Sequence, residues 1–208
     1  MTKNYFITGI GTNVGKTFCS AVLTEALQAD YWKPVQSGTV EGSDLESVKS
    51  LVSNAESRFH PEAYRFAAPV SPHLAAAIEG AQIQPENIAL PETENKTLLI
   101  EGAGGILVPL NDKAYVIDLA SAFKAEVILV VRGYLGCINH SLLSLDYLIR
   151  HQYFIKGLVL NGEFDEMVKQ SILNYTDIPL IAHFPEVTDV SAQKVKELSQ
   201  LVNTSLFI

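Results

Sequence analysis

Short apolar runs alternate along this chain with longer amphipathic segments. The runs are rich in Val, Ile and Leu, a composition typical of buried strands, and they predict strands near residues 4–8, 31–35, 97–100, 126–131, 155–160 and 179–183. The longer segments carry apolar residues at helical spacing and predict helices near residues 15–28, 43–53, 72–79, 114–123, 138–151, 165–174 and 191–203. This alternation is typical of an α/β fold with a mostly parallel sheet and helices on both faces.

The segment 54–95 has a less regular pattern. It contains five prolines and several acidic residues, which indicates loops around one short helix. No repeat, linker or low-complexity tract interrupts the chain, so we expect one domain over residues 1–208.

Composition and charge narrow the class of protein. Hydrophobic residues make up 48% of the 208 residues and charged residues 18%, which is enough apolar surface for a large core. The formal net charge is −8 and Lys and Arg do not cluster, so neither nucleic acid nor a membrane is an expected partner. No apolar run approaches the ~18 residues of a membrane span and the N-terminus lacks a signal pattern, so the expected location is the cytoplasm. Cys19 and Cys137 fit buried thiols better than zinc ligands or a disulfide.

The strongest chemical signal is NYFITGIGTNVGKT at residues 4–17, where an apolar strand gives way to glycines and then to Gly-Lys-Thr at a helix start. A phosphate-binding loop usually has four residues between its first glycine and the Gly-Lys pair, whereas five separate Gly9 from Gly15. The longer loop can still surround a triphosphate, because glycines permit unusual backbone angles and free N–H groups lie at the positive end of a helix dipole. Lys16 would add a positive charge and Thr17 a hydroxyl for Mg²⁺. The alternative is a turn whose glycines serve geometry alone.

Two acidic residues are candidate Mg²⁺ ligands. Glu101 directly follows the predicted strand TLLI, at the edge where ligands bind in open α/β sheets. Gly102, Ala103 and Gly104 come next, and such small residues let backbone approach a ligand closely; a glycine turn with a solvated acid is the alternative. Asp44, in GSDLESV, suits either a metal ligand or a helix N-cap, and both interpretations stay open.

The stretch YWKPVQSG places a lysine, Lys33, inside an apolar strand. Its side chain either extends to the strand edge and reaches water or is aimed at an anion, and the local pattern favours reaching water. Ser37 then begins a polar loop that suits substrate contact.

Six stretches in order, FITGIGTNVGKT, WKPVQSG, SDLESV, PVSPHLAA, EGAGGILVPL and LGCINHSLLSL, resemble the ATP-dependent dethiobiotin synthetases of biotin biosynthesis. The resemblance runs from residue 6 to residue 145 and implies a P-loop NTPase-like fold. It also implies a reaction in which 7,8-diaminononanoate and CO₂ form a carbamate and the carbamate attacks the γ-phosphate of ATP. The second amine then displaces phosphate, which gives dethiobiotin, ADP and phosphate.

The resemblance implies a role for each matching residue. Lys16 would stabilise the transferring phosphoryl group, and Lys33 the carbamate and the charge that develops on its phosphate anhydride. The implied Mg²⁺ ligands are Thr17, Asp44 and Glu101. The residues implied to bind the nucleotide and its metal are Thr12, Asn13, Val14, Gly15, Lys16, Thr17, Asp44, Glu101, Gly102, Ala103, Gly104, Asn161, Phe184, Pro185 and Glu186. The residues implied to contact the diamine substrate are Thr12, Lys33, Ser37, Leu135, Gly136, Cys137 and Asn139.

The family resemblance also implies a homodimer, in which the LGCINH segment receives the substrate carboxylate across the interface through backbone N–H groups at a helix start. His140, in the same segment, fits ordinary packing or capping. The chain departs from the family pattern at Asn13, where relatives often carry Glu, and at Gly162, where an acid often follows Asn161.

A second class of function uses similar loops. ATPase switches of the MinD/ParA type act through protein partners and alter no small metabolite. The final residues, SQLVNTSLFI, lack the basic amphipathic pattern of a membrane-binding helix, which disfavours this alternative. A ligase with a glutamine-hydrolysing domain is disfavoured as well, because Cys137 lacks the context of its nucleophile.

Overall fold

A seven-stranded parallel sheet forms the centre of the molecule. The computed structural model describes residues 2–175 and 177–207. The strand order is β4-β2-β6-β1-β7-β8-β9, and the neighbouring strands pair in parallel. The bounds are β1 Lys3–Gly9, β2 Asp30–Trp32, β4 Phe59–His60, β6 Thr97–Gly105, β7 Glu126–Arg132, β8 Ile155–Asn161 and β9 Leu180–Phe184. A separate parallel pair consists of β3 Val35–Ser37 and β5 Tyr64–Phe66.

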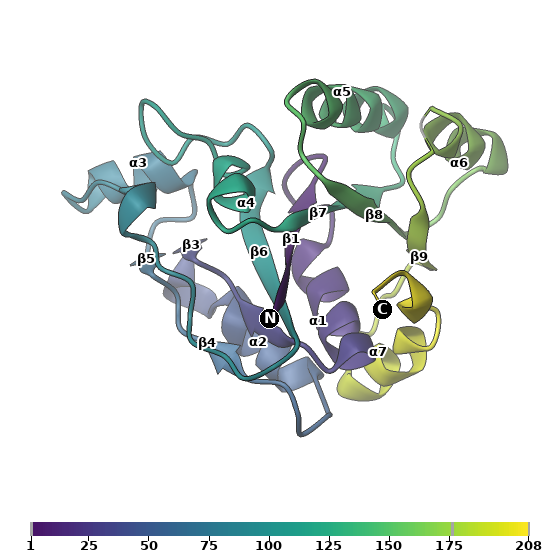
Figure 1. Ribbon diagram of the computed structural model, residues 1–208, viewed down its shortest axis with the longest axis horizontal. Coiled ribbons are helices and arrows are strands. Elements are labelled where there is room, and N and C mark those ends of the chain that lie inside the picture. The colour runs from purple at the N-terminus through teal and green to yellow at the C-terminus, as the bar shows by residue number, and fades with distance from the viewer. Residues whose placement is uncertain (1, 176, 208) are drawn as a thin grey trace.

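Helices cover both faces of this sheet. The α-helices are α1 Lys16–Leu27, α2 Asp44–Leu51, α3 Pro72–Ile78, α4 Asp118–Ala122, α5 Cys137–Arg150, α6 Glu166–Leu173 and α7 Ala192–Ser199. Short 3₁₀ turns are η1 Thr39–Glu41, η2 Pro85–Asn87 and η3 Thr204–Phe207. In Figure 1, α1, α2 and α7 lie on one side of the sheet and α5 and α6 on the other. The predicted α/β class, with a mostly parallel sheet between two helical layers, is confirmed.

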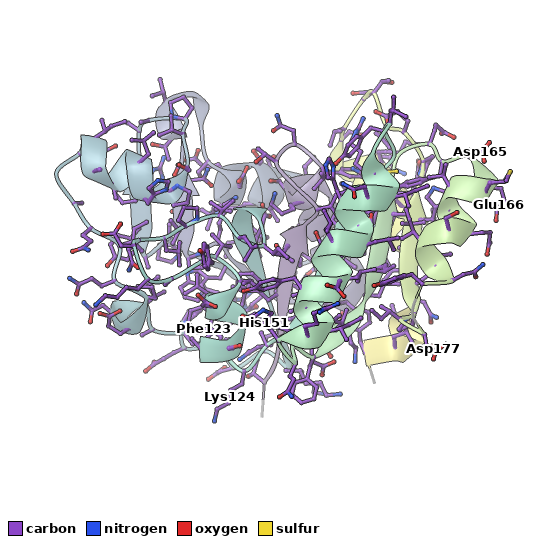
Figure 2. The ribbon with its side chains drawn as sticks, turned by 90° about the horizontal axis from the view of Figure 1, so that it is seen from above. Phe123, Lys124, His151, Asp165, Glu166 and Asp177 are labelled. Carbon is purple, nitrogen blue, oxygen red and sulfur yellow. The ribbon has the colours of Figure 1, made fainter. Side chains whose placement is uncertain are left out.

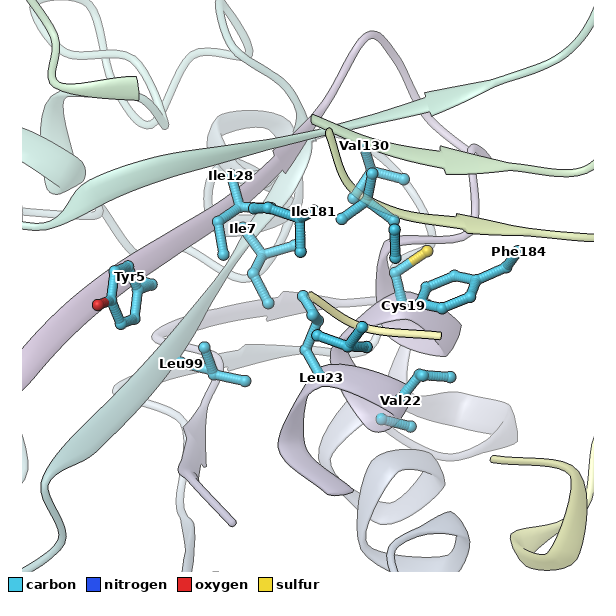
Figure 3. Packing of buried hydrophobic residues seen from close by; sticks show 14 of the residues in the cluster. Tyr5, Ile7, Cys19, Val22, Leu23, Leu99, Ile128, Val130, Ile181 and Phe184 are labelled. Atoms are coloured by element: carbon cyan, nitrogen blue, oxygen red, sulfur yellow. The ribbon is translucent and has the colours of Figure 1, made fainter. Parts of the chain in front are cut away.

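Alternation along the strands divides the core into two layers. Tyr5 and Ile7 of β1 belong to the cluster under α1, whereas Phe6 between them belongs to the cluster on the opposite face. The same alternation separates Leu99 from Ile100 on β6. Figure 3 shows side chains of the first cluster, from β1, β6 and β7, packing against α1. Because each strand is apolar on both faces, the sheet is buried between the helices.

The amino ends of the strands lie along one side of the sheet and the carboxyl ends along the opposite side, and these two sides are called its amino edge and its carboxyl edge. Lys124, His151 and Asp177 precede β7, β8 and β9, and Figure 2 shows them together at one edge of the molecule. Asp165 and Glu166 follow β8 and lie at the opposite edge. All carboxyl ends of parallel strands therefore meet at one edge, where such folds bind ligands.

At the amino edge, Asp30 ties β2 to its surroundings. Its side chain is 1% exposed and accepts hydrogen bonds from the backbone N–H of Arg58, Nε2 of His60, Oγ1 of Thr93 and Nδ2 of Asn95. Burial would raise the pKa of Asp30, but these donors outweigh burial and hold the pKa below its usual value. The carboxylate therefore joins β2 to β4 and to the loop before β6.

Several predicted boundaries were wrong. The strand predicted at 31–35 is two strands, β2 and β3, with Lys33 and Pro34 between them. The strand predicted at 97–100 continues through Glu101 to Gly105, and the segment 54–95 contains β4 and β5 besides its short helix. The helices predicted at 114–123 and 191–203 are shorter, since α4 begins at Asp118 and α7 ends at Ser199. Both cysteines are buried and free, as predicted.

Candidate active site

The glycine-rich loop between β1 and α1 has a conformation that only small residues permit. Gly15 has a φ of 87°, and a Cβ at this position would lie 2.1 Å from Nδ2 of Asn161. A Cβ on Gly9 would lie 2.5 Å from Cγ2 of Val14. The loop is also supported from β8, because Asn161 Nδ2 donates a hydrogen bond to the Val14 carbonyl at 2.9 Å. The glycines thus allow a tight loop whose backbone leads into the N-terminus of α1.

Lys16 is the first residue of α1, and its side chain turns back over the loop. Its Nζ donates a hydrogen bond to the Gly11 carbonyl at 3.3 Å, and the residue is 7% exposed. Burial lowers the pKa of Lys16 below its usual value, and the nearby Glu101 carboxylate offsets only part of this effect. The loop and the ammonium together form a cationic cradle of the kind that binds phosphate.

Glu101 lies where β6 passes the start of α1. Its side chain is fully buried, and Oε1 accepts hydrogen bonds from Thr17 Oγ1 at 3.0 Å and from Lys33 Nζ at 3.1 Å. Its other oxygen, Oε2, accepts a hydrogen bond from the Tyr31 hydroxyl at 2.9 Å. A solvated acid in a glycine turn is therefore the wrong interpretation of Glu101.

Lys33 forms a partly buried ion pair with Asp44 and a buried one with Glu101. The residue is 5% exposed, so the interpretation in which its side chain reaches water was wrong. Burial alone would lower the pKa of Lys33, but the two carboxylates outweigh burial, and the pKa is raised. Lys33 therefore stays protonated across the physiological range.

Ser43, and not Asp44, caps helix α2. Ser43 Oγ accepts a hydrogen bond from the N–H of Glu46, and the Glu46 side chain accepts one from the N–H of Ser43, which completes a capping box. Asp44 is the first helical residue, so its carboxylate is available for Lys33. Burial would raise the pKa of Asp44, but Lys33 outweighs burial and lowers it, so Asp44 is ionised. The N-cap interpretation of Asp44 was wrong.

Two further residues shape the site and were missing from the sequence-based prediction. Tyr31 holds Glu101 as described. Its position two residues before Lys33, in the stretch predicted as one strand, was an available signal, because alternate strand residues share a face. Gln36 is 6% exposed; its Oε1 accepts a hydrogen bond from the N–H of Asp44 and its Nε2 donates one to the Ser37 carbonyl. No local pattern distinguishes Gln36 from an ordinary loop residue.

These groups open into one cleft at the carboxyl edge of the sheet, with a volume of about 850 Å³. The predicted site residues that line it are Thr12, Asn13, Gly15, Lys16, Thr17, Lys33, Ser37, Asp44, Glu101, Ala103 and Gly104. Val70, Ser71 and Pro72 also line the cleft. Val14 and Gly102 are not part of the lining: Val14 is buried, and a Cβ on Gly102 would lie 3.0 Å from Phe6.

The LGCINH segment does not line this cleft. Leu135 is fully exposed, Gly136 precedes α5 with a φ of 104°, and Cys137 is buried at the helix start. Asn139 is exposed, and the ring of His140 pairs through Nδ1 with the Tyr134 hydroxyl at 2.6 Å. The predicted tail-binding residues therefore lie outside the lining of this cleft.

Of the residues implied to bind the nucleotide, Asn161, Phe184, Pro185 and Glu186 lie at or directly after the ends of β8 and β9. Phe184 is fully buried, and its ring packs against Phe18. Its carbonyl accepts a hydrogen bond from the N–H of Gly162. Pro185 follows directly. Glu186 forms an ion pair with Arg132 at 2.6 Å, and its Oε2 lies 2.8 Å from where a Cβ on Gly162 would stand. Glycine at 162 thus leaves room for the Glu186 side chain.

The donor set fits Mg²⁺. Thr17, Asp44 and Glu101 contribute only oxygen atoms, the donor type that Mg²⁺ prefers. Within residues 2–175 and 177–207, no group of three or more His, Cys, Asp or Glu side chains gathers to bind a metal by itself. The arrangement therefore suits a cation that takes one or two carboxylates from the protein and its remaining ligands from phosphate and water.

A parallel sheet, a glycine loop that leads into a helix with Lys-Thr, and the Glu101 carboxylate on the adjacent strand β6 define a P-loop NTPase-like protein. The chain matches the family model described as an AAA domain over residues 3–194. It is 50% identical over 181 residues to the ATP-dependent dethiobiotin synthetase of Cytophaga hutchinsonii, with 87% of each chain covered. It is 46% identical over 200 residues to that of Christiangramia forsetii, with 96% of each covered. The chain belongs to the ATP-dependent dethiobiotin synthetase family.

Solved structures with the same fold include more distant proteins. The septum site-determining protein MinD of Pyrococcus horikoshii, solved with Mg-ADP, is 18% identical with a TM-score of 0.58, over 96% of this chain and 95% of that one. A ParA family ATPase of Chlorobium tepidum is 12% identical with a TM-score of 0.60, over 100% and 99% of the two chains. At such low identity the likeness shows the fold alone. No helix in the described part of the chain is long and apolar enough to span a membrane.

Proposed function

We propose that this protein catalyses the ATP-dependent carboxylation and ring closure of 7,8-diaminononanoate to dethiobiotin. One amine attacks CO₂ and loses a proton to form a carbamate. A carbamate oxygen then attacks the γ-phosphorus of ATP, which releases ADP and leaves a carbamic-phosphoric anhydride. The second amine attacks the carbonyl carbon of the anhydride, phosphate departs, and the cyclic urea closes. We place this reaction in the cytoplasm, where ATP is abundant.

The observation that carries this proposal is the convergence of Lys16 and Lys33 on one cleft beside the glycine loop. Phosphoryl transfer depends mainly on position and on neutralisation of charge, and two fixed ammonium groups supply both. Lys16 bonds to the loop that would hold the phosphates. Lys33 is held by Asp44 and Glu101, which fixes its charge where the carbamate and the transferring phosphoryl group would meet.

Thr17, Asp44 and Glu101 would hold Mg²⁺, which neutralises phosphate charge when bound. Asn161 would read the base, and the backbone at Phe184, Pro185 and Glu186 would flank it. Asn161 also supports the glycine loop through its hydrogen bond to the Val14 carbonyl, so the same side chain would contact the base and hold the loop that binds the phosphates.

The substrate tail would bind at a dimer interface. Gly136 and Cys137 begin α5, where free N–H groups favour an anion such as a carboxylate. Because this segment does not line the cleft of its own chain, we propose that a second copy brings it to the bound diamine. The exposed Leu135 would be covered in such a homodimer. Sedimentation should then show a dimer, and Leu135→Asp should shift the protein to monomer and weaken diamine binding.

The decisive experiment follows phosphate release and dethiobiotin formation with ATP, Mg²⁺, bicarbonate and diaminononanoate. The product should appear by mass spectrometry in proportion to phosphate, and phosphate release should stop when the diamine is omitted. The Lys16→Ala variant serves as the control for contaminating activity. ATP hydrolysis at the same rate with and without the diamine would instead favour an ATPase switch.

A further inference from the structure

Tyr31 stands behind the candidate active site, in the middle of β2. In the sheet it lies beside Leu99 of β6, and both side chains belong to the cluster under α1. Glu101 is two residues beyond Leu99 and therefore on the same face, about 6.6 Å further along the strand. A tyrosine side chain spans that distance, and the Tyr31 hydroxyl donates to Glu101 Oε2 at 2.9 Å.

The two oxygens of Glu101 have different surroundings. Oε1 accepts hydrogen bonds from Thr17 and Lys33, which line the cleft. For Oε2, the structure shows one donor among the described residues, the Tyr31 hydroxyl. Because the Glu101 side chain is fully buried, water cannot replace that donor. Without it, a charged oxygen would be left buried and unpaired, and the carboxylate would turn to find another partner.

We infer that Tyr31 is a positioning residue for the reaction proposed above. Its hydroxyl fixes the orientation of the Glu101 carboxylate, so that Oε1 faces Thr17 and Lys33 at the place proposed for Mg²⁺ and the nucleotide phosphates. Partners behind a metal ligand commonly change metal affinity by about 10- to 100-fold when they are removed. The inference rests on the proposed function, because it assigns the role of Glu101 through that function.

The test uses Tyr31→Phe, which removes one oxygen and keeps the ring. Binding of the β,γ-imido analogue of ATP is measured by calorimetry over a series of Mg²⁺ concentrations. We expect the Mg²⁺ concentration that gives half-maximal binding to rise about tenfold or more, with affinity restored at saturating Mg²⁺. Turnover of Tyr31→Phe should show the same dependence on Mg²⁺, with a larger loss relative to wild type at low Mg²⁺ than at high Mg²⁺.

Tyr5→Phe is the matched control. Tyr5 is also fully buried, on β1, which is separated from β2 by β6 in the sheet, and it packs in the same cluster as Tyr31. Its hydroxyl has no hydrogen-bond partner in the described structure, so its removal breaks no polar contact. Loss of an oxygen from the core is thus common to both variants, and only Tyr31→Phe alters Glu101.

The outcomes separate this inference from the proposed function. A folded Tyr31→Phe protein with the Mg²⁺ dependence of the wild type would overturn the inference, as would an equal change in Tyr5→Phe. If Tyr31→Phe does not fold, 4-fluorophenylalanine at position 31 fills the volume of the hydroxyl without a donor, and the same titration decides. Failure of the wild type to make dethiobiotin, with a Mg²⁺ shift still present in Tyr31→Phe, would refute the proposed function and retain the positioning role.

Discussion

Replacing Lys33 by Met tests the electrostatics of the site most directly. Methionine keeps a long side chain and removes the charge, which leaves Asp44 and Glu101 without their shared counter-ion. At 3.1 Å and an effective dielectric constant of about 20, one such pair attracts by about 5 kcal/mol before desolvation is counted. Removing one partner of a buried pair typically costs about 3–5 kcal/mol. We expect the unfolding free energy of Lys33→Met to fall by that amount, a large share of the stability of a domain.

The pH dependence of this loss follows from two pKa shifts. Asp44 has a lowered pKa in the folded protein, so its pairing with Lys33 stabilises the fold above the unfolded-state pKa of about 4 and is lost as the pH falls through the folded-state value. Lys33 has a raised pKa, so its contribution is complete below about pH 10 and is lost only as the pH rises further. The difference between wild type and Lys33→Met should stay constant from about pH 6 to pH 9 and shrink below about pH 4.

Urea unfolding followed by circular dichroism at several pH values measures this difference. Lys113→Met is the control, because Lys113 is exposed and the structure shows no ion pair for it within the described residues. The double variant Lys33→Met with Glu101→Gln should recover part of the loss, because it removes one of the two uncompensated charges. A loss below about 1 kcal/mol, the value of an exposed pair, would refute the reasoning. Turnover of Lys33→Met should also fall by about 100-fold or more.

Three further predictions concern the loop, the metal and the core. Gly15→Ala should abolish nucleotide binding in equilibrium dialysis, because Gly15 has a φ of 87° and a Cβ there would clash with Asn161. A Cβ on Gly11 would meet nothing within 4 Å, so Gly11→Ala should stay as stable as wild type. Equal melting temperatures for the two variants would contradict the clash at Gly15. Asp44→Asn should raise the Mg²⁺ needed for half-maximal phosphate release about tenfold or more, and an unchanged titration would remove Asp44 from the metal site. Cys19 is fully buried and burial raises its pKa, so it should react with thiol reagents at pH 8 only after unfolding; fast labelling of folded protein would show that the core opens.

The pattern of apolar residues was sufficient to predict the central strands and the two helical layers. The run VILVV at residues 127–131 is apolar at every position because both faces of the sheet are covered, and the structure places it in β7 between helices. The Gly-Lys-Thr sequence located the start of α1 within one residue. These signals depend only on residues close together in the sequence, so a single sequence was sufficient to predict these elements.

Features that depend on contacts between distant segments were not predictable in this way. Pro34 has no N–H to donate, so β2 ends at Trp32 and a new strand begins at Val35, where the sequence predicted one continuous strand. Strands β4 and β5 have two and three residues, too few for a periodic signal. Their existence follows from pairing with β2 and β3, which the local sequence does not record.

The same limit applies to the candidate site. Lys33 fitted two local interpretations because one of its partners, Glu101, is 68 residues away along the chain. Asp44 was ambiguous because the cap could have been either Ser43 or Asp44, and only the hydrogen bonds of the capping box distinguish them. Residue type and order suggested the participants, whereas the contacts between them required the folded chain.

The hydrogen bonds around Asp30 have a consequence at the far end of the same strand. Strand β2 is three residues long, and a slip of one residue against β6 would turn Tyr31 toward the wrong helical layer and displace Lys33, which follows the strand. Asp30 anchors the strand at its start, and the ion pairs of Lys33 anchor the chain directly after its last residue, Trp32, so its register is fixed at both ends. Substitution of Asp30, at the end of the sheet remote from the cleft, should therefore lower turnover in the same way as substitution of Lys33 itself.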